Sequence, residues 1–159
     1  MEAVRGFRSP QLELVHRGKV RDSFRIDESS RLLVASDRLS AFDRVLDTPI
    51  PGKGAALTRM AAFWFAETRS IFPNHMIRTV GDRAMLVREA DPVRVEFVVR
   101  AYLAGSAWRA YAAGRRELCG VRLPEGLRGN APFPEPILTP TTKSEHDEEI
   151  TGPDIVRRG

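Results

Sequence analysis

The sequence predicts an α+β fold in which an antiparallel, β-rich N-terminal lobe is followed by the beginning of a second lobe. Short segments of alternating apolar and polar residues recur before residue 54, where helical spacing of apolar residues replaces them. The 159 residues are 42% hydrophobic and 29% charged, which is the composition of an ordinary globular chain. We expect the first lobe to occupy residues 1–90 and the incomplete second lobe residues 91–159.

An antiparallel meander is predicted at the start of the chain. Residues 11–17 and 20–26 alternate in polarity, and Gly18-Lys19 forms the turn between them. The polar turn at residues 27–30 then leads to a strand at 32–36. Further strands are predicted at residues 75–80, 84–88 and 94–100.

One amphipathic helix is predicted to cover a face of this sheet. It starts at Gly54 and stops before Pro73-Asn74. Residues at helical spacing define its apolar side: Leu57, Met60, Ala61, Trp64, Thr68 and Ile71. Trp64, and Trp108 in a later helix, are interpreted as core residues.

The second lobe is predicted to open with a short helix. Ser106 suits the N-cap position, the helix runs through Ala113, and Gly114 suits the position after its end. Residues 123–142 contain five prolines and are interpreted as an ordered loop over a site. Residues 148–158 resemble the opening of another helix, and the three consecutive acids at 147–149 could act there against the helix dipole.

Charge and composition narrow the function classes. The formal net charge of +4 resides in residues 1–80, which indicates an anionic partner such as a nucleotide, a phosphorylated metabolite or nucleic acid. The longest uncharged apolar run, 60–66, is far shorter than the ~20 residues of a membrane helix. A single cysteine, Cys119, fits a reducing compartment, so we expect a cytoplasmic protein.

The first candidate site is the predicted hairpin at residues 18–22. Gly18 allows backbone amides to approach a ligand, and Lys19 and Arg21 could neutralise phosphate. An ordinary turn with solvated charges is the alternative.

A second candidate follows the strand at 32–36. The segment 37–43 combines two acids, an arginine and Ser40, and could orient an anionic or metal-bound substrate. A capping box formed by Ser40 and Asp43 is an equal alternative. Lys53, between two glycines, could approach phosphate or simply begin the helix after it.

Arg100 and Ser106 form the third candidate. A guanidinium at a strand end and a hydroxyl with free amides at a helix start would converge on one place that favours a phosphate dianion. A surface arginine and a routine N-cap remain the alternative. Lys143, His146 and Asp147 lie in a segment dense in hydroxyls and acids that could assist metal or amino-acid binding, although a lone histidine is more often solvated.

Taken together and in this order, these segments resemble the SAICAR synthetase family, the phosphoribosylaminoimidazole-succinocarboxamide synthases of purine biosynthesis. The resemblance covers nearly the whole chain. It is carried by residues 18–22 (GKVRD), 37–43 (DRLSAFD), 50–54 (IPGKG), 96–108 (EFVVRAYLAGSAW) and 133–143 (FPEPILTPTTK).

The resemblance implies a two-lobed ligase that uses ATP and Mg2+ to join L-aspartate to the carboxylate of carboxyaminoimidazole ribonucleotide. It implies small-molecule substrates, with neither a membrane nor nucleic acid as a partner. The implied roles are ATP binding for Gly18, Lys19 and Arg21, and substrate binding for Ser40, Asp43, Lys53, Arg100, Ser106, Lys143, His146 and Asp147. Arg100 and Ser106 would contact the 5′-phosphate of the nucleotide.

Family members continue with an Asp-x-Lys-x-Glu-Phe-Gly strand and an acidic segment that hold magnesium. This sequence has no counterpart, so we expect no metal ligands in it. The chain is therefore interpreted as an N-terminal portion of the enzyme that is inactive alone. The alternative is a non-catalytic truncated paralogue that binds nucleotides or nucleic acid through its basic hairpin.

Overall fold

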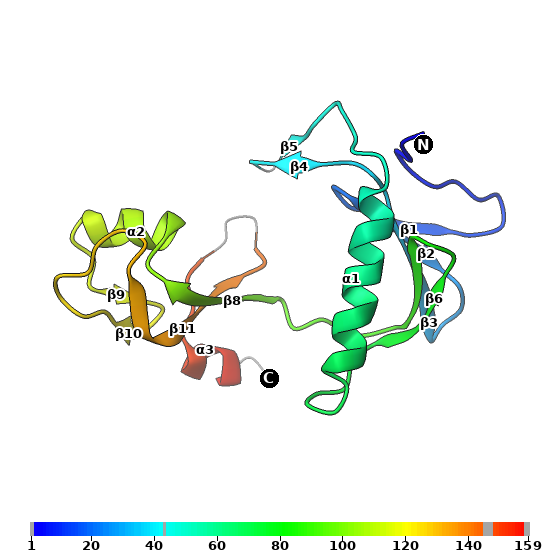
Figure 1. Ribbon diagram of the computed structural model, residues 1–159. Helices are drawn as coiled ribbons and strands as arrows, with labels where there is room; N and C mark the ends of the chain where they lie inside the picture. Colours follow the sequence, from blue (N-terminus) through cyan, green and yellow to red (C-terminus); the bar gives the residue numbers. More distant parts are fainter. Residues whose placement is uncertain (1, 43, 145–147, 158–159) are drawn as a thin grey trace. The chain divides into compact units, whose positions relative to one another are not determined.

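The alternating segments near the start of the chain form one antiparallel sheet in the computed structural model, which describes residues 2–42, 44–144 and 148–157. The chain divides into two units, Met1–Asp91 and Pro92–Gly159. The sheet belongs to the first unit, and its strand order is β1-β2-β3-β7-β6 (Figure 1). Its strands are β1 (Leu14–Arg17), β2 (Arg21–Arg25), β3 (Ser30–Ala35), β6 (Met76–Val80) and β7 (Ala84–Arg88). Each lies within three residues of its predicted position.

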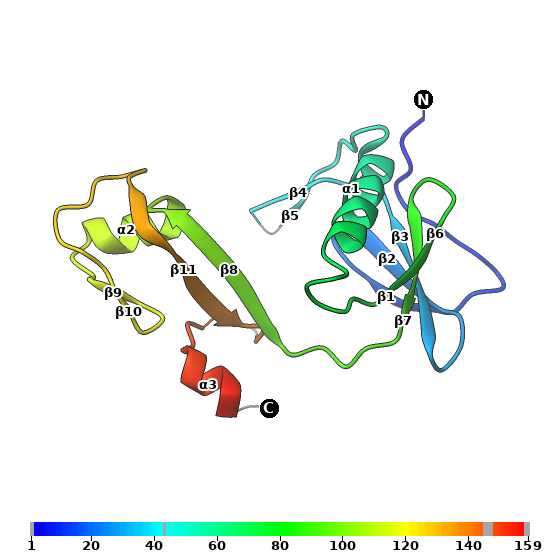
Figure 2. The same cartoon turned by 60° about the horizontal axis from the view of Figure 1, so that its bottom comes forward.

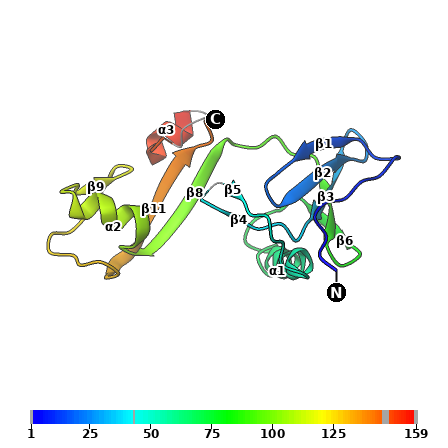
Figure 3. The ribbon, with the colours of Figure 1, turned by 90° about the horizontal axis from the view of Figure 1, so that it is seen from above.

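The two faces of this sheet are covered by different segments. Phe24 of β2 and Val34 of β3 are buried on one face, where the N-terminal segment places Phe7 edge-on against Phe24. Helix α1 (Lys53–Glu67) lies against the other face, and Figure 3 shows it end-on. The short hairpin of β4 (Ser40–Ala41) and β5 (Arg44–Val45) precedes the helix.

Helix α1 confirms the predicted element but not the predicted face. Its side toward the sheet carries the buried Gly54, Ala55 and Thr58, because small residues allow the helix to approach closely. Trp64 is 57% exposed, so its interpretation as a core residue is wrong. Met60, on the same predicted side, is 59% exposed, whereas Ala61 and Phe65 line a cavity against the sheet.

The second unit is built on a ribbon of two antiparallel strands, β8 (Val95–Tyr102) and β11 (Pro132–Thr142) (Figure 2). Helix α2 (Gly105–Ala112) and the small hairpin β9 (Glu117–Leu118) and β10 (Val121–Arg122) complete it, with α3 (Gly152–Arg157) near the end. Its core consists of buried residues from these elements and their connections: Leu103, Ala107, Tyr111, Leu118, Leu123 and Phe133. Trp108 is 36% exposed and lies outside this buried set, which corrects its interpretation as a core residue.

Strand β11 corrects the prediction of a loop over residues 123–142. Prolines are tolerated in a strand when the missing N–H would have faced away from the partner strand. The Pro140 carbonyl accepts a hydrogen bond from the Ile150 amide, so the backbone of residue 140 faces away from β8. Pro140 therefore removes no hydrogen bond from the β8–β11 ladder. The other prolines of β11 lie in the stretch from Pro132 to Ile137, where the pairing register is irregular.

Both helix starts in the second unit differ from the predictions. Ala104, not Ser106, occupies the N-cap of α2, and Ser106 lies inside the first turn. Helix α3 begins four residues later than predicted, at Gly152, where the Thr151 hydroxyl and the Asp154 carboxylate form a reciprocal cap. Gly114 follows the C-cap of α2 with φ 97°, as predicted. Among the described residues, no helix has the length and apolar character needed to cross a bilayer.

Candidate functional site

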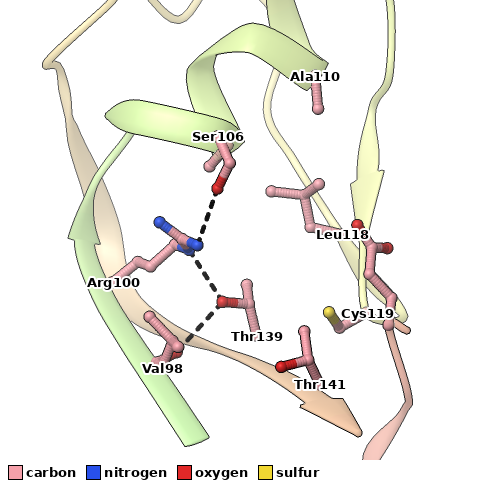
Figure 4. Close-up of a pocket in the computed structure, with 10 residues that line it drawn as sticks. Val98, Arg100, Ser106, Ala110, Leu118, Cys119, Thr139 and Thr141 are labelled. Atoms are coloured by element: carbon pink, nitrogen blue, oxygen red, sulfur yellow. Dashed lines mark hydrogen bonds between the residues drawn. The ribbon is translucent and has the colours of Figure 1, made fainter. Parts of the chain in front are cut away.

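Arg100 is the centre of a polar cluster in the second unit (Figure 4). Its Nε donates a hydrogen bond to the Thr139 Oγ1 at 2.9 Å, and its Nη2 donates to the Ser106 Oγ at 3.2 Å. Thr139 donates in turn to the Val98 carbonyl at 3.2 Å. The strand residue and the helix residue that the sequence predicted to converge therefore do meet, with Thr139 of β11 fixing the guanidinium from the side.

This cluster opens onto a cavity of about 240 Å3 between the ribbon and α2. The ribbon supplies one wall, α2 another, and the β9 region the third (Figure 4). The lining residues are Val98, Arg100, Ser106, Ala107, Ala110, Leu118, Cys119, Thr139, Thr141 and Glu149. Guanidinium and hydroxyl donors beside apolar side chains suit a ligand with an anionic group and a less polar body.

The charges around the cavity leave Arg100 available to an anion. Within ranges 2–42, 44–144 and 148–157, Arg100 contacts hydroxyls and forms no ion pair with a carboxylate. Glu149 also lines the cavity, but Arg115 holds it through hydrogen bonds of 2.8 and 2.6 Å. These bonds lower the pKa of Glu149, which stays ionised and paired. Burial, and then the charge of Glu149, raise the pKa of Cys119, so its thiol is protonated near neutral pH.

The hairpin between β1 and β2 belongs to the first unit. The Gly18 amide donates to the Arg21 carbonyl at 2.8 Å, and a side chain on Gly18 would bring its Cβ within 3.0 Å of that oxygen. Arg38 holds the turn from outside by donating to the Gly18 and Lys19 carbonyls, each at 3.0 Å. Arg38 also pairs with the buried Asp22 at 2.7 Å, so the turn has a fixed shape.

Asp37 is enclosed by hydrogen-bond donors of the protein and is not open to a ligand. It is fully buried and accepts hydrogen bonds of 2.8 Å from the amides of Val4 and Gly54 and 3.1 Å from Arg83. Burial would raise its pKa, but these three donors outweigh that effect and lower the pKa to about 2. Asp37 therefore caps α1 from a distance and fastens the N-terminal segment.

The other candidate residues after β3 are Ser40, Asp43 and Lys53, and they do not form one site. Ser40 is half-buried in β4, where no helix begins, so the capping-box alternative is wrong. Asp43 lies outside the described residues. Lys53 is the first residue of α1 and donates to the Arg38 carbonyl at 3.1 Å, which agrees with the structural alternative for that position.

Lys143 is not part of the Arg100 cluster. It forms an ion pair with Glu96, and its amide bonds to the Arg94 carbonyl at the far end of the ribbon. Arg94 precedes Arg100 by six positions of extended chain, a span of roughly 20 Å. His146 and Asp147 lie outside the described residues.

Sequence reasoning missed Thr139 as a member of the site. The signal was present in the alternation of Ile137, Thr139 and Thr141, which places all three on one face of a strand. Pro140 and the prolines before Ile137 obscured this alternation. Among the described residues, no three histidine, cysteine, aspartate or glutamate side chains gather as a metal site would require.

A sequence profile of the family described as SAICAR synthetase matches residues 14–159. The chain belongs to the SAICAR synthetase family. The match includes the hairpin at Gly18, the Arg100 cluster and all of β11.

Individual members of the SAICAR synthetase family agree with this assignment. The phosphoribosylaminoimidazole-succinocarboxamide synthase of Polaromonas naphthalenivorans is 48% identical over 162 positions, covering 92% of this chain and 53% of that protein. The synthase of Bacteroides thetaiotaomicron is 46% identical and covers 96% and 50%. The chain spans about half the length of the curated relatives it matches.

Solved structures of SAICAR synthetases confirm the α+β fold. The SAICAR synthase of Saccharomyces cerevisiae, solved in complex with SAICAR, superposes with a TM-score of 0.87 at 32% identity. The superposition covers 98% of this chain and 58% of the yeast chain. A synthetase from Pyrococcus horikoshii shares the fold at a TM-score of 0.70 and 22% identity, covering 87% and 57%.

Proposed function

We propose that this chain is the N-terminal portion of an ATP-dependent carbon–nitrogen ligase of purine biosynthesis, acting in the cytoplasm. The ligase joins L-aspartate to the carboxylate of carboxyaminoimidazole ribonucleotide and releases ADP and phosphate. The observation that carries the proposal is the Arg100 cluster: a guanidinium without a carboxylate partner among the described residues, beside two hydroxyls, on a cavity of about 240 Å3. The reaction itself is inferred from membership of the SAICAR synthetase family.

The residues of the second unit would hold the ribonucleotide. Arg100 would bind the 5′-phosphate with the Nη atoms that Thr139 leaves exposed, and Ser106 would donate its hydroxyl to a phosphate oxygen. The first turn of α2 adds backbone amides at the same place. Lys143, His146 and Asp147 remain proposed contacts near the aspartate.

The residues of the first unit would hold ATP. Gly18, Lys19 and Arg21 would surround its phosphates, with the turn kept in shape by Arg38. Ser40, Asp43 and Lys53 are proposed substrate contacts. The described residues offer no cluster of acidic, histidine or cysteine side chains suited to Mg2+.

The chemistry follows from the low reactivity of a carboxylate. A carboxylate oxygen attacks the γ-phosphorus of ATP, the bond to the β-phosphate oxygen breaks, and ADP leaves. The aspartate amine then attacks the carbon of the acyl phosphate, phosphate leaves with the bonding electrons, and the amine loses a proton to give the amide. Cationic side chains stabilise the charge that develops on the transferred group.

Binding of ribose 5-phosphate to the purified chain tests whether the Arg100 cluster is a phosphate site. We expect saturable shifts of the Arg100 and Ser106 resonances in NMR titrations, and at least a tenfold loss of affinity in Arg100→Met. Arg122→Met, on the exposed β10, is the matched control and should bind as the parent does. Equal binding by the parent and Arg100→Met would refute the proposed phosphate site.

Activity requires the rest of the polypeptide. We expect no aspartate-dependent ADP release from the 159-residue chain alone. A chimera in which this chain replaces the matching half of the Polaromonas naphthalenivorans protein should release ADP only when aspartate and the ribonucleotide are both present. RNA binding that weakens steeply with salt and ignores ATP would instead support a nucleic-acid-binding paralogue.

A further inference from the structure

The β8–β11 ribbon has two unlike faces. One face carries Arg100 and Thr139 and is covered by α2 across the cavity. On the other face, Val99 and Leu138 lie directly opposite each other, and Phe97 lies two residues along β8. These three side chains are 70%, 40% and 52% exposed, in the order Val99, Leu138, Phe97. We call this set the ribbon patch.

The row of β8 that faces away from α2 is the apolar row. An antiparallel strand with one face in water directs its apolar row toward a core and its polar row toward water. The outer row consists of Val95, Phe97, Val99 and Ala101, whereas the inner row contains the charged Glu96 and Arg100. Among the described residues, β11 is the sole ladder partner of β8, and two-stranded ribbons are marginal in water.

The length of the relatives identifies what covers this face. The chain matches 53% of the Polaromonas naphthalenivorans protein and 58% of the yeast structure, so these proteins carry nearly as much polypeptide again. A patch of three side chains is much smaller than the roughly 800 Å2 per partner of a stable protein–protein interface, so a second copy of this chain is a poor occupant. The ribbon patch is large enough to form one part of a larger packing surface within a domain.

We propose that the ribbon patch is the docking face for the half of the family polypeptide that this chain does not match. Phe97, Val99 and Leu138 pack against apolar side chains of that half, which turns the ribbon into the middle layer of a domain. The proposal rests on family membership and not on the reaction, so its test is a measurement of stability.

The test compares one substitution in two proteins. Val99→Lys is made in the 159-residue chain and in the chimera with the unmatched half of the Polaromonas naphthalenivorans protein. We expect the thermal midpoint of the chain to change by less than about 2 °C, because the side chain is exposed there. In the chimera, the midpoint should fall by about 5 °C or more, because a lysine would be buried without a partner.

Two further variants make the comparison specific. Leu138→Lys should reproduce the effect of Val99→Lys, because the two residues are cross-strand neighbours. Ile26→Lys replaces an apolar residue of the first unit with 43% exposure and should leave both proteins unchanged. If a lysine variant of the chimera fails to fold while the same variant of the chain folds, the proposal is supported, and Val99→Thr should then give a smaller, measurable shift.

Several results would overturn the proposal. One is an unchanged thermal midpoint for Val99→Lys in the chimera. A second is a fall of the thermal midpoint in the isolated chain that equals the fall in the chimera. A third is an unsubstituted chimera that does not unfold cooperatively. A chain that dimerises through the patch, becoming monomeric as Val99→Lys, with an unaffected chimera, would assign the patch to self-association instead. Each of these readouts is independent of whether Arg100 binds phosphate.

Discussion

Asp37 accepts a hydrogen bond from the Gly54 amide at 2.8 Å, which joins the end of β3 to the first turn of α1. The N-cap position of α1 is Gly52, which has no side chain to satisfy the free amides of the first turn. The buried carboxylate performs this function from another element and binds Arg83 at the same time. One ionised group therefore joins the start of the helix to the end of β3, in addition to the packing of the helix on the sheet.

This arrangement predicts a loss of stability in acid. Because the pKa of Asp37 is about 2, against 3.8 for a carboxyl in the unfolded chain, its contribution is complete above about pH 5 and is lost as the pH falls through 2. The difference corresponds to about 2 kcal/mol. Urea unfolding at several pH values should show Asp37→Asn less stable than the parent at pH 7, with the gap closing toward pH 2. A constant gap would contradict the prediction.

Gly54 is predicted to tolerate no side chain. A Cβ at this position would lie 2.5 Å from the Ala35 carbonyl oxygen, so the helix would have to move away from β3. Gly54→Ala should lower the free energy of unfolding by about 2 kcal/mol or more. Gly152→Ala is the matched control, because a Cβ there meets nothing within 4 Å, and it should change stability by less than about 0.5 kcal/mol.

His75 is predicted to lower stability when it is protonated. It lines a cavity of about 150 Å3 between α1 and the sheet, and its ring lies 5.3 Å from that of Phe65. Burial first, and then the charge of Arg21, lower its pKa. The unfolded chain therefore binds a proton more readily, and stability falls as the pH drops below about 6.5. His75→Phe should flatten the dependence of the thermal midpoint between pH 7 and pH 5.

Thr139 is predicted to act on ligand binding through Arg100. Thr139→Val keeps the shape of the buried side chain but removes the oxygen that accepts from Arg100 Nε. We expect affinity for ribose 5-phosphate to fall by about tenfold, which corresponds to one lost hydrogen bond. Thr139→Ser should restore most of it. If both variants unfold at the parent's urea midpoint yet bind equally well, Thr139 does not position the guanidinium.

The sheet of the first unit was predictable because its strands and turns are specified by residues that are neighbours in the sequence. Segments such as 20–26 alternate in polarity and are separated by turn residues, so neighbours in sequence decide both the element and its faces. The face of α1 was not predictable from periodicity. Leu57, Met60 and Trp64 share helical spacing, but so do Gly54, Thr58 and Ala61, and close approach to the Ala35 carbonyl selected the smaller set.

The candidate site was predictable in part. The convergence of Arg100 and Ser106 follows from a strand end and a helix start six residues apart, although Ser106 does not cap the helix. Thr139 lay in a segment whose prolines indicated a loop. Asp37 and Arg38 were considered for substrate binding, and their structural contacts with Val4, Gly54 and Asp22 are set by tertiary packing that no local pattern encodes.

Proline in β11 determines at which edge of the ribbon a further strand can pair. The outer edge of β11 lacks an N–H group at Pro140, and the backbone near Thr142 is already paired with residues 148–150. An extended peptide arriving on that side would find acceptors with few donors. The opposite edge, along Phe97 and Val99, keeps every amide. Strands can therefore be added to this sheet from one side only, which protects the other side from unwanted pairing.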